Sequence, residues 1–260
     1  MSDRLKHKTA LITGATRGIG LAIAEAYAAE GANLALNARD STRLAEVATQ
    51  ISAKHKVEIS VHACDVVNRE AVSAMVNAVE ARGPIDILVN NAGIHKAAPF
   101  LSYTPEDFRE VFEVNFFGVL HVTQLVLPGM IARRAGRLVN LASTAGKWGS
   151  RNQSAYNVSK HAVVALTRCL GLEMAPYNIG VNAICPWIVD TEMATSFLAE
   201  HAKASGLSIE QATANFVNAV PIKRYIRPDE VASLAVYLGS DEASYISGQS
   251  WTVDGGYTMI

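Results

Sequence analysis

Cysteine and net charge are both scarce in this sequence. Only three of its 260 residues are cysteines, Cys64, Cys169 and Cys185, and they form no CxxC pair. An odd and scattered set gives no disulfide framework and no zinc site, so we expect buried, reduced thiols and no bound metal. The formal net charge of -1 at pH 7 gives no electrostatic reason to bind nucleic acid.

Long hydrophobic runs are missing as well. No uninterrupted run of about 18 apolar residues occurs, which is what a membrane-spanning helix needs. The segment Met1–Arg4 leads into a strand-like run without the apolar core of a signal peptide. We therefore expect a cytoplasmic protein with no membrane partner. Half of the residues are hydrophobic and 18% are charged, a balance that allows a full hydrophobic core.

Short apolar segments alternate with longer amphipathic segments along the chain. Strands are predicted at Thr9–Thr13, Leu34–Ala38, Glu58–Cys64, Ile85–Val89, Arg137–Ala142, Gly180–Cys185 and Ser250–Val253. Helices are predicted at Leu21–Glu30, in the stretch that ends at Ile51, and at Ala71–Ala81, Pro105–Arg133, Ala155–Ala175 and Pro228–Leu238. Apolar strands separated by helices indicate a parallel sheet that is covered on both faces.

The prediction is therefore an α/β fold, a single Rossmann-type doubly wound parallel sheet that spans residues 1–260 as one nucleotide-binding domain. No linker or internal repeat divides it. One segment, at about 189–220, contains no strand and is rich in Ala, Thr, Ser and Glu. We interpret it as a helical lid over the ligand cleft, with a plain surface insertion as the alternative.

A glycine-rich turn separates the first predicted strand from the first helix. Its glycines follow the spacing Gly-x3-Gly-x-Gly in Thr13–Gly20. Such a turn lets the backbone approach a pyrophosphate closely, and the helix N-terminus directs N–H groups at the anion. The context between strand and helix makes a dinucleotide site the favoured interpretation over an empty glycine turn. The cofactor-binding residues predicted here are Gly14, Thr16, Arg17, Gly18, Ile19 and Gly20.

The end of the second strand indicates which dinucleotide binds. NAD sites usually place an acidic side chain there, about 20 residues after the glycines, to hold the ribose. Ala38 occupies that place and Arg39 follows it. Arg17 reaches the same corner, and two guanidiniums can clamp a 2′-phosphate. The sequence favours NADP over NAD, although Asp40 in a shifted register would favour NAD.

Tyr156 and Lys160 stand four residues apart on a predicted helix, so they share one face. A nearby ammonium favours the phenolate, and we expect Lys160 to lower the pKa of Tyr156. Such a pair can donate or accept a proton near neutral pH. Ser143 lies at the end of another strand, at the edge where doubly wound sheets bind ligands, and can hold a substrate oxygen against Tyr156. Alone, the Tyr–Lys pair would be an ordinary helix surface.

With these motifs together, the chain resembles the classical short-chain dehydrogenase/reductase family over essentially its whole length. The shared pieces are TGATRGIG at Thr13–Gly20, CDV at Cys64–Val66, NNAG at Asn90–Gly93, Asn115, Ser143 and the Tyr156/Lys160 pair. The resemblance implies an NADP(H)-dependent oxidoreductase that acts on a ketone or secondary alcohol. It also implies a homotetramer that pairs the long helices.

The resemblance assigns individual roles. Tyr156 is similar to the proton donor and acceptor, and Lys160 to the residue that holds the nicotinamide ribose. Ser143 corresponds to the substrate-oxygen anchor, and Asn115 to the residue that positions a water in a proton relay. Further cofactor contacts implied in this way are Asp65, Val66, Asn91, Ala92, Gly93, Pro186, Ile188 and Thr191.

The substrate is less closely defined. The chain is most similar to 3-ketoacyl and polyketide ketoreductases, but Tyr177 falls where a carrier-protein-binding arginine is expected beside Arg134. Trp187 replaces a usual glycine beside the nicotinamide. His95, Trp148, Trp187 and Phe197 are candidates for an apolar substrate pocket, although each is also an ordinary packing residue.

Three alternatives are weighed against this interpretation. The first is an NAD-dependent sugar, polyol or hydroxyacid dehydrogenase of the same family. The second is a nucleotide-sensing regulator, which would have lost Ser143, Tyr156 or Lys160, and all three are present. The third is a Ser–His hydrolase, which is disfavoured because no G-x-S-x-G elbow occurs.

Overall fold

The computed structural model describes residues 3–259. Its strands form one parallel sheet in the order β3-β2-β1-β4-β5-β6-β7. Their bounds are β1 Thr9–Thr13, β2 Asn33–Ala38, β3 Ile59–Ala63, β4 Ile87–Asn90, β5 Gly136–Leu141, β6 Ile179–Pro186 and β7 Ser250–Val253. The order reverses between β1 and β4, as in a doubly wound sheet. The predicted α/β fold class is confirmed.

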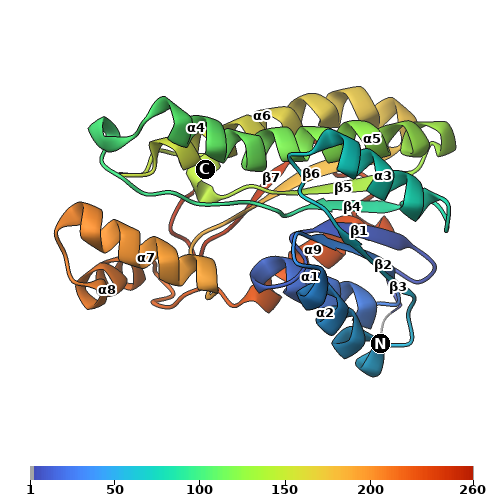
Figure 1. The fold of residues 1–260 in the computed structure, drawn as a ribbon, viewed down its shortest axis with the longest axis horizontal. Coiled ribbons are helices and arrows are strands. Elements are labelled where there is room, and N and C mark those ends of the chain that lie inside the picture. The colour runs from blue at the N-terminus through green and yellow to red at the C-terminus, as the bar shows by residue number, and fades with distance from the viewer. Residues whose placement is uncertain (1–2, 260) are drawn as a thin grey trace.

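Helices cover both faces of the sheet, as Figure 1 shows. One face carries α1 Gly18–Ala29, α2 Ser41–Lys54 and α9 Pro228–Gly239. The other carries α3 Arg69–Glu80, α4 Pro105–Phe112, α5 Gly118–Arg133 and α6 Ser154–Met174. Two more helices, α7 Glu192–Ser205 and α8 Ile209–Ala219, pack on each other beside the sheet. They occupy the segment for which the sequence predicts no strand.

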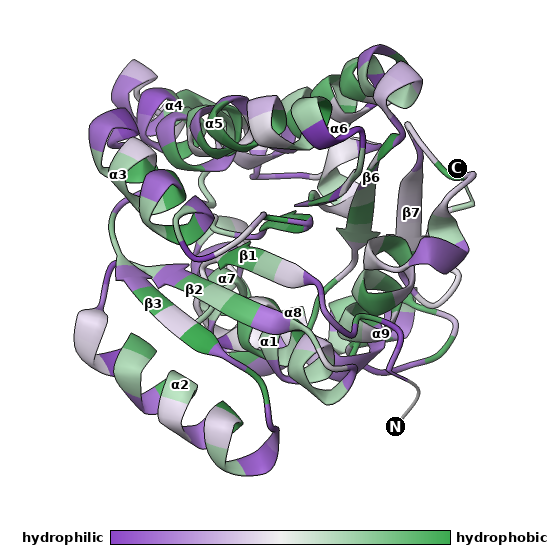
Figure 2. Ribbon diagram, turned by 90° about the vertical axis from the view of Figure 1, so that its right-hand side faces the viewer, coloured by the Kyte–Doolittle hydropathy of each residue, from purple (hydrophilic) through white to green (hydrophobic). Residues whose placement is uncertain are grey.

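The strands are apolar because both of their faces are buried. In β1, Ala10 and Ile12 pack into the core under α1, α2 and α9, while Leu11 packs into the core under α3 and α5. The side chains alternate between the two sides because successive residues of a strand point to opposite faces. Figure 2 shows hydrophobic (green) segments in β1 and β2, and hydrophilic (purple) segments along α4.

The predicted single helix over Pro105–Arg133 is wrong in one respect. A π-helical turn at Glu113–Phe117 separates α4 from α5, and such turns often occur at functional sites. The whole stretch is long and apolar enough to cross a membrane by those two criteria. It is nevertheless a core helix, since its residues Val122, Val126 and Met130 are fully buried against the sheet side of the fold.

The cysteines differ in their surroundings. Cys185 is buried and Cys64 is half-buried, but Cys169 is exposed on α6, so the expectation of buried thiols is wrong for Cys169. Nothing in the periodicity of α6 distinguishes this position, because cysteine is tolerated on either face of a helix. Within residues 3–259, no three His, Cys, Asp or Glu side chains gather as metal ligands.

Candidate active site

One cleft opens where several parallel strands end. The strands β1, β4, β5 and β6 end at Thr13, Asn90, Leu141 and Pro186, and in a parallel sheet these ends lie along one edge. The loops that follow them enclose a cavity of about 120 Å³. Predicted site residues that line this cavity are Ile19, His95, Ser143, Trp148, Tyr156, Pro186, Trp187, Ile188, Thr191 and Phe197.

Ser143 and Tyr156 reach the cleft from different elements. Ser143 follows β5 in an extended conformation, and its side chain accepts a hydrogen bond from the N–H of Ala145 (3.1 Å). Tyr156 lies in the first turn of α6. The ring of His95 packs against the Tyr156 ring, with centroids 4.7 Å apart. The predicted serine and tyrosine are therefore brought to one place by residues far apart in the chain.

Lys160 lies one turn after Tyr156 and is almost fully buried, with 5% of its surface exposed. Its ammonium donates to the carbonyl oxygen of Leu141 (2.8 Å) and stands 5.7 Å from the centre of the Tyr156 ring. Burial lowers the pKa of Lys160 to about 8, because a charged group loses its hydration. The carbonyl group at the end of β5 therefore holds the Lys160 ammonium inside the protein.

The pKa of Tyr156 moves in the direction opposite to the prediction. Burial raises it to about 12, and a hydrogen bond from Ser143 offsets only part of that rise. Lys160 does not lower it here, because the ammonium is bonded to the Leu141 carbonyl and not to the phenol. Tyr156 is consequently protonated at neutral pH, which suits it to donate a proton.

Asn115 lies in the π-helical turn and is fully buried. Its side chain accepts a hydrogen bond from the N–H of Ile94 (2.8 Å) and donates to the Ile94 carbonyl (3.0 Å). It also donates to the hydroxyl of Ser159 (3.0 Å), the neighbour of Lys160. In this arrangement the Asn115 amide fastens the loop after β4 to α6.

The glycine turn fits a dinucleotide phosphate. Gly14 and Gly18 have left-handed φ angles of 65° and 55°, which L side chains rarely adopt. A Cβ on Gly20 would lie 2.2 Å from the Gly14 carbonyl oxygen and 2.4 Å from the Asn91 amide nitrogen. The N-cap residue Arg17 makes no side-chain capping bond. The first N–H groups of α1 are therefore open to an anion.

Other predicted cofactor residues support this turn. Asn91 donates to the carbonyl oxygens of Thr13 and Gly14 (3.0 Å each). The N–H of Ala92 donates to the Thr13 hydroxyl (3.0 Å). Gly93 lies beside the buried Lys160, since a Cβ on Gly93 would be 3.6 Å from the Lys160 ammonium. Thr16 lies in the turn itself.

At the end of β2, the structure assigns the two charged residues separate tasks. Asp40 caps the N-terminus of α2, where its carboxylate accepts from the N–H of Arg43 (3.0 Å). Arg39 remains on the surface, 3.9 Å from the Asp65 carboxylate. The Arg17 guanidinium forms an ion pair with the Glu192 carboxylate at the start of α7 (2.8 Å). It is therefore not directed at the end of β2 beside Arg39, where the sequence predicted it. Val66 is buried against Gly118 of α5.

Trp187 causes no backbone strain. Its N–H donates to the carbonyl of Val253 (3.0 Å) and its φ is not positive, so no glycine is required there. The indole stacks on Tyr257 with centroids 4.1 Å apart. Next to it, Ile188 is buried against Phe197 of α7. Thr191 caps α7. Its side chain also lies close to Gly18, since a Cβ on Gly18 would be 3.1 Å from the Thr191 methyl group.

Sequence reasoning missed part of the cleft. Ser150, Gln153, Met193 and Ala194 also line it. Gln153 immediately precedes α6 and stands three residues before Tyr156. Its nearness to Tyr156 in the sequence was the one signal available. Met193 and Ala194 depend on how α7 packs, which no local pattern indicates.

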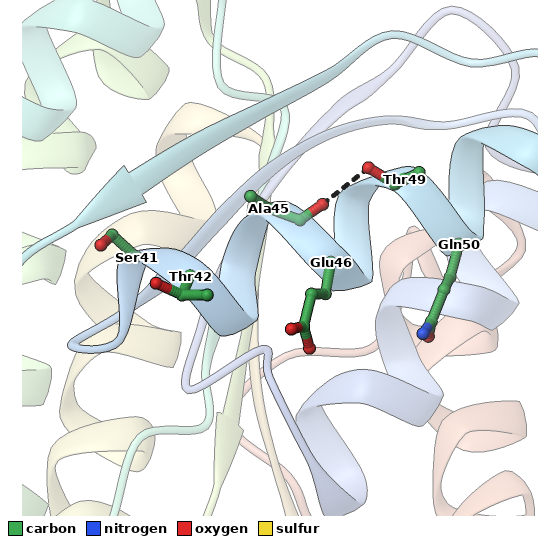
Figure 3. A pocket seen from close by; sticks show the side chains of 6 residues that line it. All are labelled: Ser41, Thr42, Ala45, Glu46, Thr49 and Gln50. Carbon is green, nitrogen blue, oxygen red and sulfur yellow. Dashed lines mark hydrogen bonds between the residues drawn. The ribbon is translucent and has the colours of Figure 1, made fainter.

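A second, open depression lies on α2, as Figure 3 shows. All six residues that line it come from this one helix, among them Ser41, Glu46 and Gln50. It holds none of the predicted catalytic residues. The cleft beside Tyr156 is the candidate active site because Ser143 and Tyr156 line it, the buried Lys160 lies one turn after Tyr156, and Ile19 of the glycine turn reaches it.

Comparisons with known proteins find relatives that match almost the whole chain. The family model described as Enoyl-(Acyl carrier protein) reductase matches residues 14–258. Galactitol 2-dehydrogenase of Agrobacterium fabrum is 40% identical over 258 residues, which cover 98% of this chain and 99% of that protein. D-beta-hydroxybutyrate dehydrogenase of Cupriavidus necator is 37% identical over 255 residues, 97% of this chain and 98% of its own.

A solved structure is equally similar. The crystal structure of a tryptophan variant of actinorhodin polyketide ketoreductase with NADPH superposes with a TM-score of 0.92 at 40% identity. The match covers 96% of this chain and 97% of that chain. These relatives share one fold but differ in the substrate that each is named for.

Proposed function

This chain belongs to the classical short-chain dehydrogenase/reductase family, and from that premise we propose that it reduces a ketone reversibly with NADPH. An oxidoreductase activity on carbonyl or CH–OH groups follows from the family alone. The preference for NADPH rests on the charges at the end of β2. The substrate we propose is a 3-oxoacyl-like or other small ketone.

The residues of the cleft would carry the reaction in distinct ways. The dinucleotide, when bound, supplies the hydride. Ser143 would donate a hydrogen bond to the substrate carbonyl oxygen and orient it. Tyr156 would give its proton to the same oxygen as the alcohol forms, and take it back in oxidation. Lys160 would bind the ribose through its ammonium, and Asn115 would keep Lys160 and the loop after β4 in place.

Cofactor choice is supported by Asp40 and Arg39. NAD enzymes of this fold usually place an acid at the ribose, and Asp40, the first acid after β2, is engaged in capping α2. Arg39 is exposed and opposite in charge to a 2′-phosphate. This favours NADP, with Arg39, Asp65 and Val66 on the adenosine side and the glycine turn on the pyrophosphate.

A second candidate function is an NAD-dependent sugar, polyol or hydroxyacid dehydrogenase. The named activities of two relatives, galactitol 2-dehydrogenase and D-beta-hydroxybutyrate dehydrogenase, favour it. The structure of a relative with NADPH favours the first candidate. Tyr156 suits both candidates, because it can donate its proton in reduction and accept one in oxidation.

A substrate panel separates the two candidates. β-Ketoacyl thioesters, cyclic ketones and sugars are offered with NADPH and with NADH, and polyols and hydroxyacids with NADP⁺ and with NAD⁺. The change in absorbance of the dinucleotide is followed in each case. The proposal expects faster turnover with NADPH and none in Tyr156→Phe. Turnover with NADH alone, or only in the direction of alcohol oxidation, would favour the second candidate.

We further propose one domain in which α7 and α8 act as a lid over the substrate, and a homotetramer. The lid is supported by Met193, Ala194 and Phe197, which line the cleft from α7. Assembly through the long helices is supported by Val158 and Leu172 of α6, which expose 48% and 81% of their surface. Light scattering coupled to gel filtration tests the tetramer; a monomer mass would overturn it.

A further inference from the structure

The loop after β3 lies beside the end of β2, where the proposed function places the adenosine of the dinucleotide. The two strands are neighbours, and Ala38 of β2 pairs with Ala63 of β3. Residues that follow them therefore meet at one edge of the sheet. The Arg39 guanidinium accordingly lies 3.9 Å from Oδ2 of Asp65. The conformation of this loop decides how the Asp65 carboxylate is presented to a ligand.

The peptide group between Val66 and Val67 is held at both of its polar ends. Its N–H donates to Oδ1 of Asp65 at 3.2 Å. Its carbonyl oxygen lies 3.1 Å from Nδ1 of His121 on α5. Because a carbonyl oxygen only accepts hydrogen bonds, the Nδ1 atom of His121 carries the hydrogen and donates it. Two hydrogen bonds in series thus connect the half-buried His121 to the Asp65 carboxylate.

Helix α5 supports the same loop at two further points. Gly118 packs against Val66 so closely that a Cβ on Gly118 would lie 2.7 Å from a Val66 methyl carbon. Arg69, the first residue of α3, donates to the side-chain oxygen of Gln124 on α5 at 2.9 Å. Gly118, His121 and Gln124 are spaced by three residues and so lie along one side of α5. This side of the helix is the support of the loop after β3.

The support of the adenosine side is separate from the support of the reacting groups. Asn115, in the π-helical turn directly before α5, bonds to Ile94 and to the Ser159 hydroxyl. His121 lies in α5 itself and bonds to the loop after β3. A change at His121 therefore leaves the contacts of Asn115 in place.

We propose that His121 is a positioning residue for the adenosine half of the dinucleotide. Its Nδ1–H holds the Val66 carbonyl, so that the Val67 N–H stays on Oδ1 of Asp65 and Oδ2 faces the ligand beside Arg39. The inference rests on the proposed function and deepens it, since it names the residue on which the adenosine contacts depend. His121 acts through the loop and touches no reacting atom, so its effect is confined to the affinity for the dinucleotide.

Two measurements on the whole protein test this role. The first is the Kd of NADPH by calorimetry, which needs no substrate, and the second is kcat at saturating NADPH with the best ketone of the substrate panel. His121→Leu removes the donor. His121→Asn keeps one in nearly the same place, because the amide nitrogen and Nδ1 are both bonded to Cγ. His55→Leu makes the same change in a half-buried histidine at the C-terminal end of α2 and is the matched control.

We expect His121→Leu to raise the Kd of NADPH by about fivefold to thirtyfold, because the Val66 carbonyl loses its donor and the loop its fixed conformation. The value of kcat should stay within about twofold of wild type, since the reacting groups keep their supports. His121→Asn should return the Kd to within about threefold of wild type. His55→Leu should change neither quantity.

An unchanged Kd in His121→Leu would overturn the inference and leave ketone reduction intact. So would a Kd in His121→Asn as high as that in His121→Leu, because the hydrogen bond would then not be the cause. A fall in kcat by the same factor as the affinity would assign His121 a merely structural role and also overturn it. If wild type binds neither NADPH nor NADH, the proposed function fails first. His121→Phe, which keeps a planar ring and removes the N–H, gives the same test if His121→Leu does not fold.

Discussion

Replacing Lys160 by methionine should separate what this residue does for catalysis from what it does for stability. The ammonium is buried, and its pKa falls from 10.5 to about 8. At about 1.36 kcal/mol for each tenfold change, burial of this charge destabilises the folded protein by about 3 kcal/mol at pH 7. Methionine has a similar length and carries no charge.

The opposing effect is the loss of one hydrogen bond. Lys160 donates to the carbonyl of Leu141 at 2.8 Å, and an unpartnered buried carbonyl costs about 1–3 kcal/mol. The free energy of unfolding of Lys160→Met at pH 7 should therefore equal or exceed that of wild type by up to about 2 kcal/mol. Turnover should be lost.

The pH dependence gives the sharper test. A lysine with a depressed pKa in the folded state destabilises that state fully below pH 8, and the penalty disappears as the pH approaches 10.5. Wild type should therefore gain about 2–3 kcal/mol on the variant between pH 7 and pH 10. Urea unfolding of both proteins, purified without nucleotide, measures this difference. A gap that does not change with pH would refute the reasoning.

Three further variants test other parts of the site. Tyr156→Phe should reduce kcat by about 10³-fold or more yet leave NADPH binding, followed by fluorescence titration, within a few-fold; substantial residual turnover would remove Tyr156 from its role. Arg39→Asp should raise KM for NADPH by about tenfold or more and leave KM for NADH unchanged or lower; equal effects on both would contradict the ribose-phosphate assignment. Gly20→Ala should weaken dinucleotide binding by at least about tenfold, because the alanine Cβ would lie 2.2 Å from the Gly14 carbonyl oxygen. An unchanged affinity, measured by calorimetry, would disprove that the glycine turn binds the dinucleotide phosphates.

The strand pattern was predictable because each strand is buried on both faces. Continuous apolar runs and intervening helices follow directly from that burial, and β1 is found at the predicted residues Thr9–Thr13. The π-helical turn at Glu113–Phe117 was not predictable, because its residues continue the helical pattern on either side. Tertiary contacts of Asn115 with Ile94 and Ser159 accompany the turn, and a local window does not contain them.

The site was predictable in its composition but not in its electrostatics. Spacing alone indicated that Tyr156 and Lys160 share a helix face. It did not indicate that the Lys160 ammonium donates to the Leu141 carbonyl, nor that burial raises the pKa of Tyr156. The pairing of Arg17 with Glu192 of α7 was also unpredictable, because it joins residues 175 positions apart.

The central claim, carbonyl reduction by hydride transfer with Tyr156 as the acid, is tested most directly by isotope transfer. NADPH deuterated at C4 of the nicotinamide is incubated with the protein and a reducible ketone, and the alcohol is examined by mass spectrometry and NMR. The account predicts one deuterium on the carbinol carbon with wild type and almost no alcohol with Tyr156→Phe. Alcohol that carries no deuterium at that carbon from either cofactor hydrogen, or equal yields from both proteins, would contradict it.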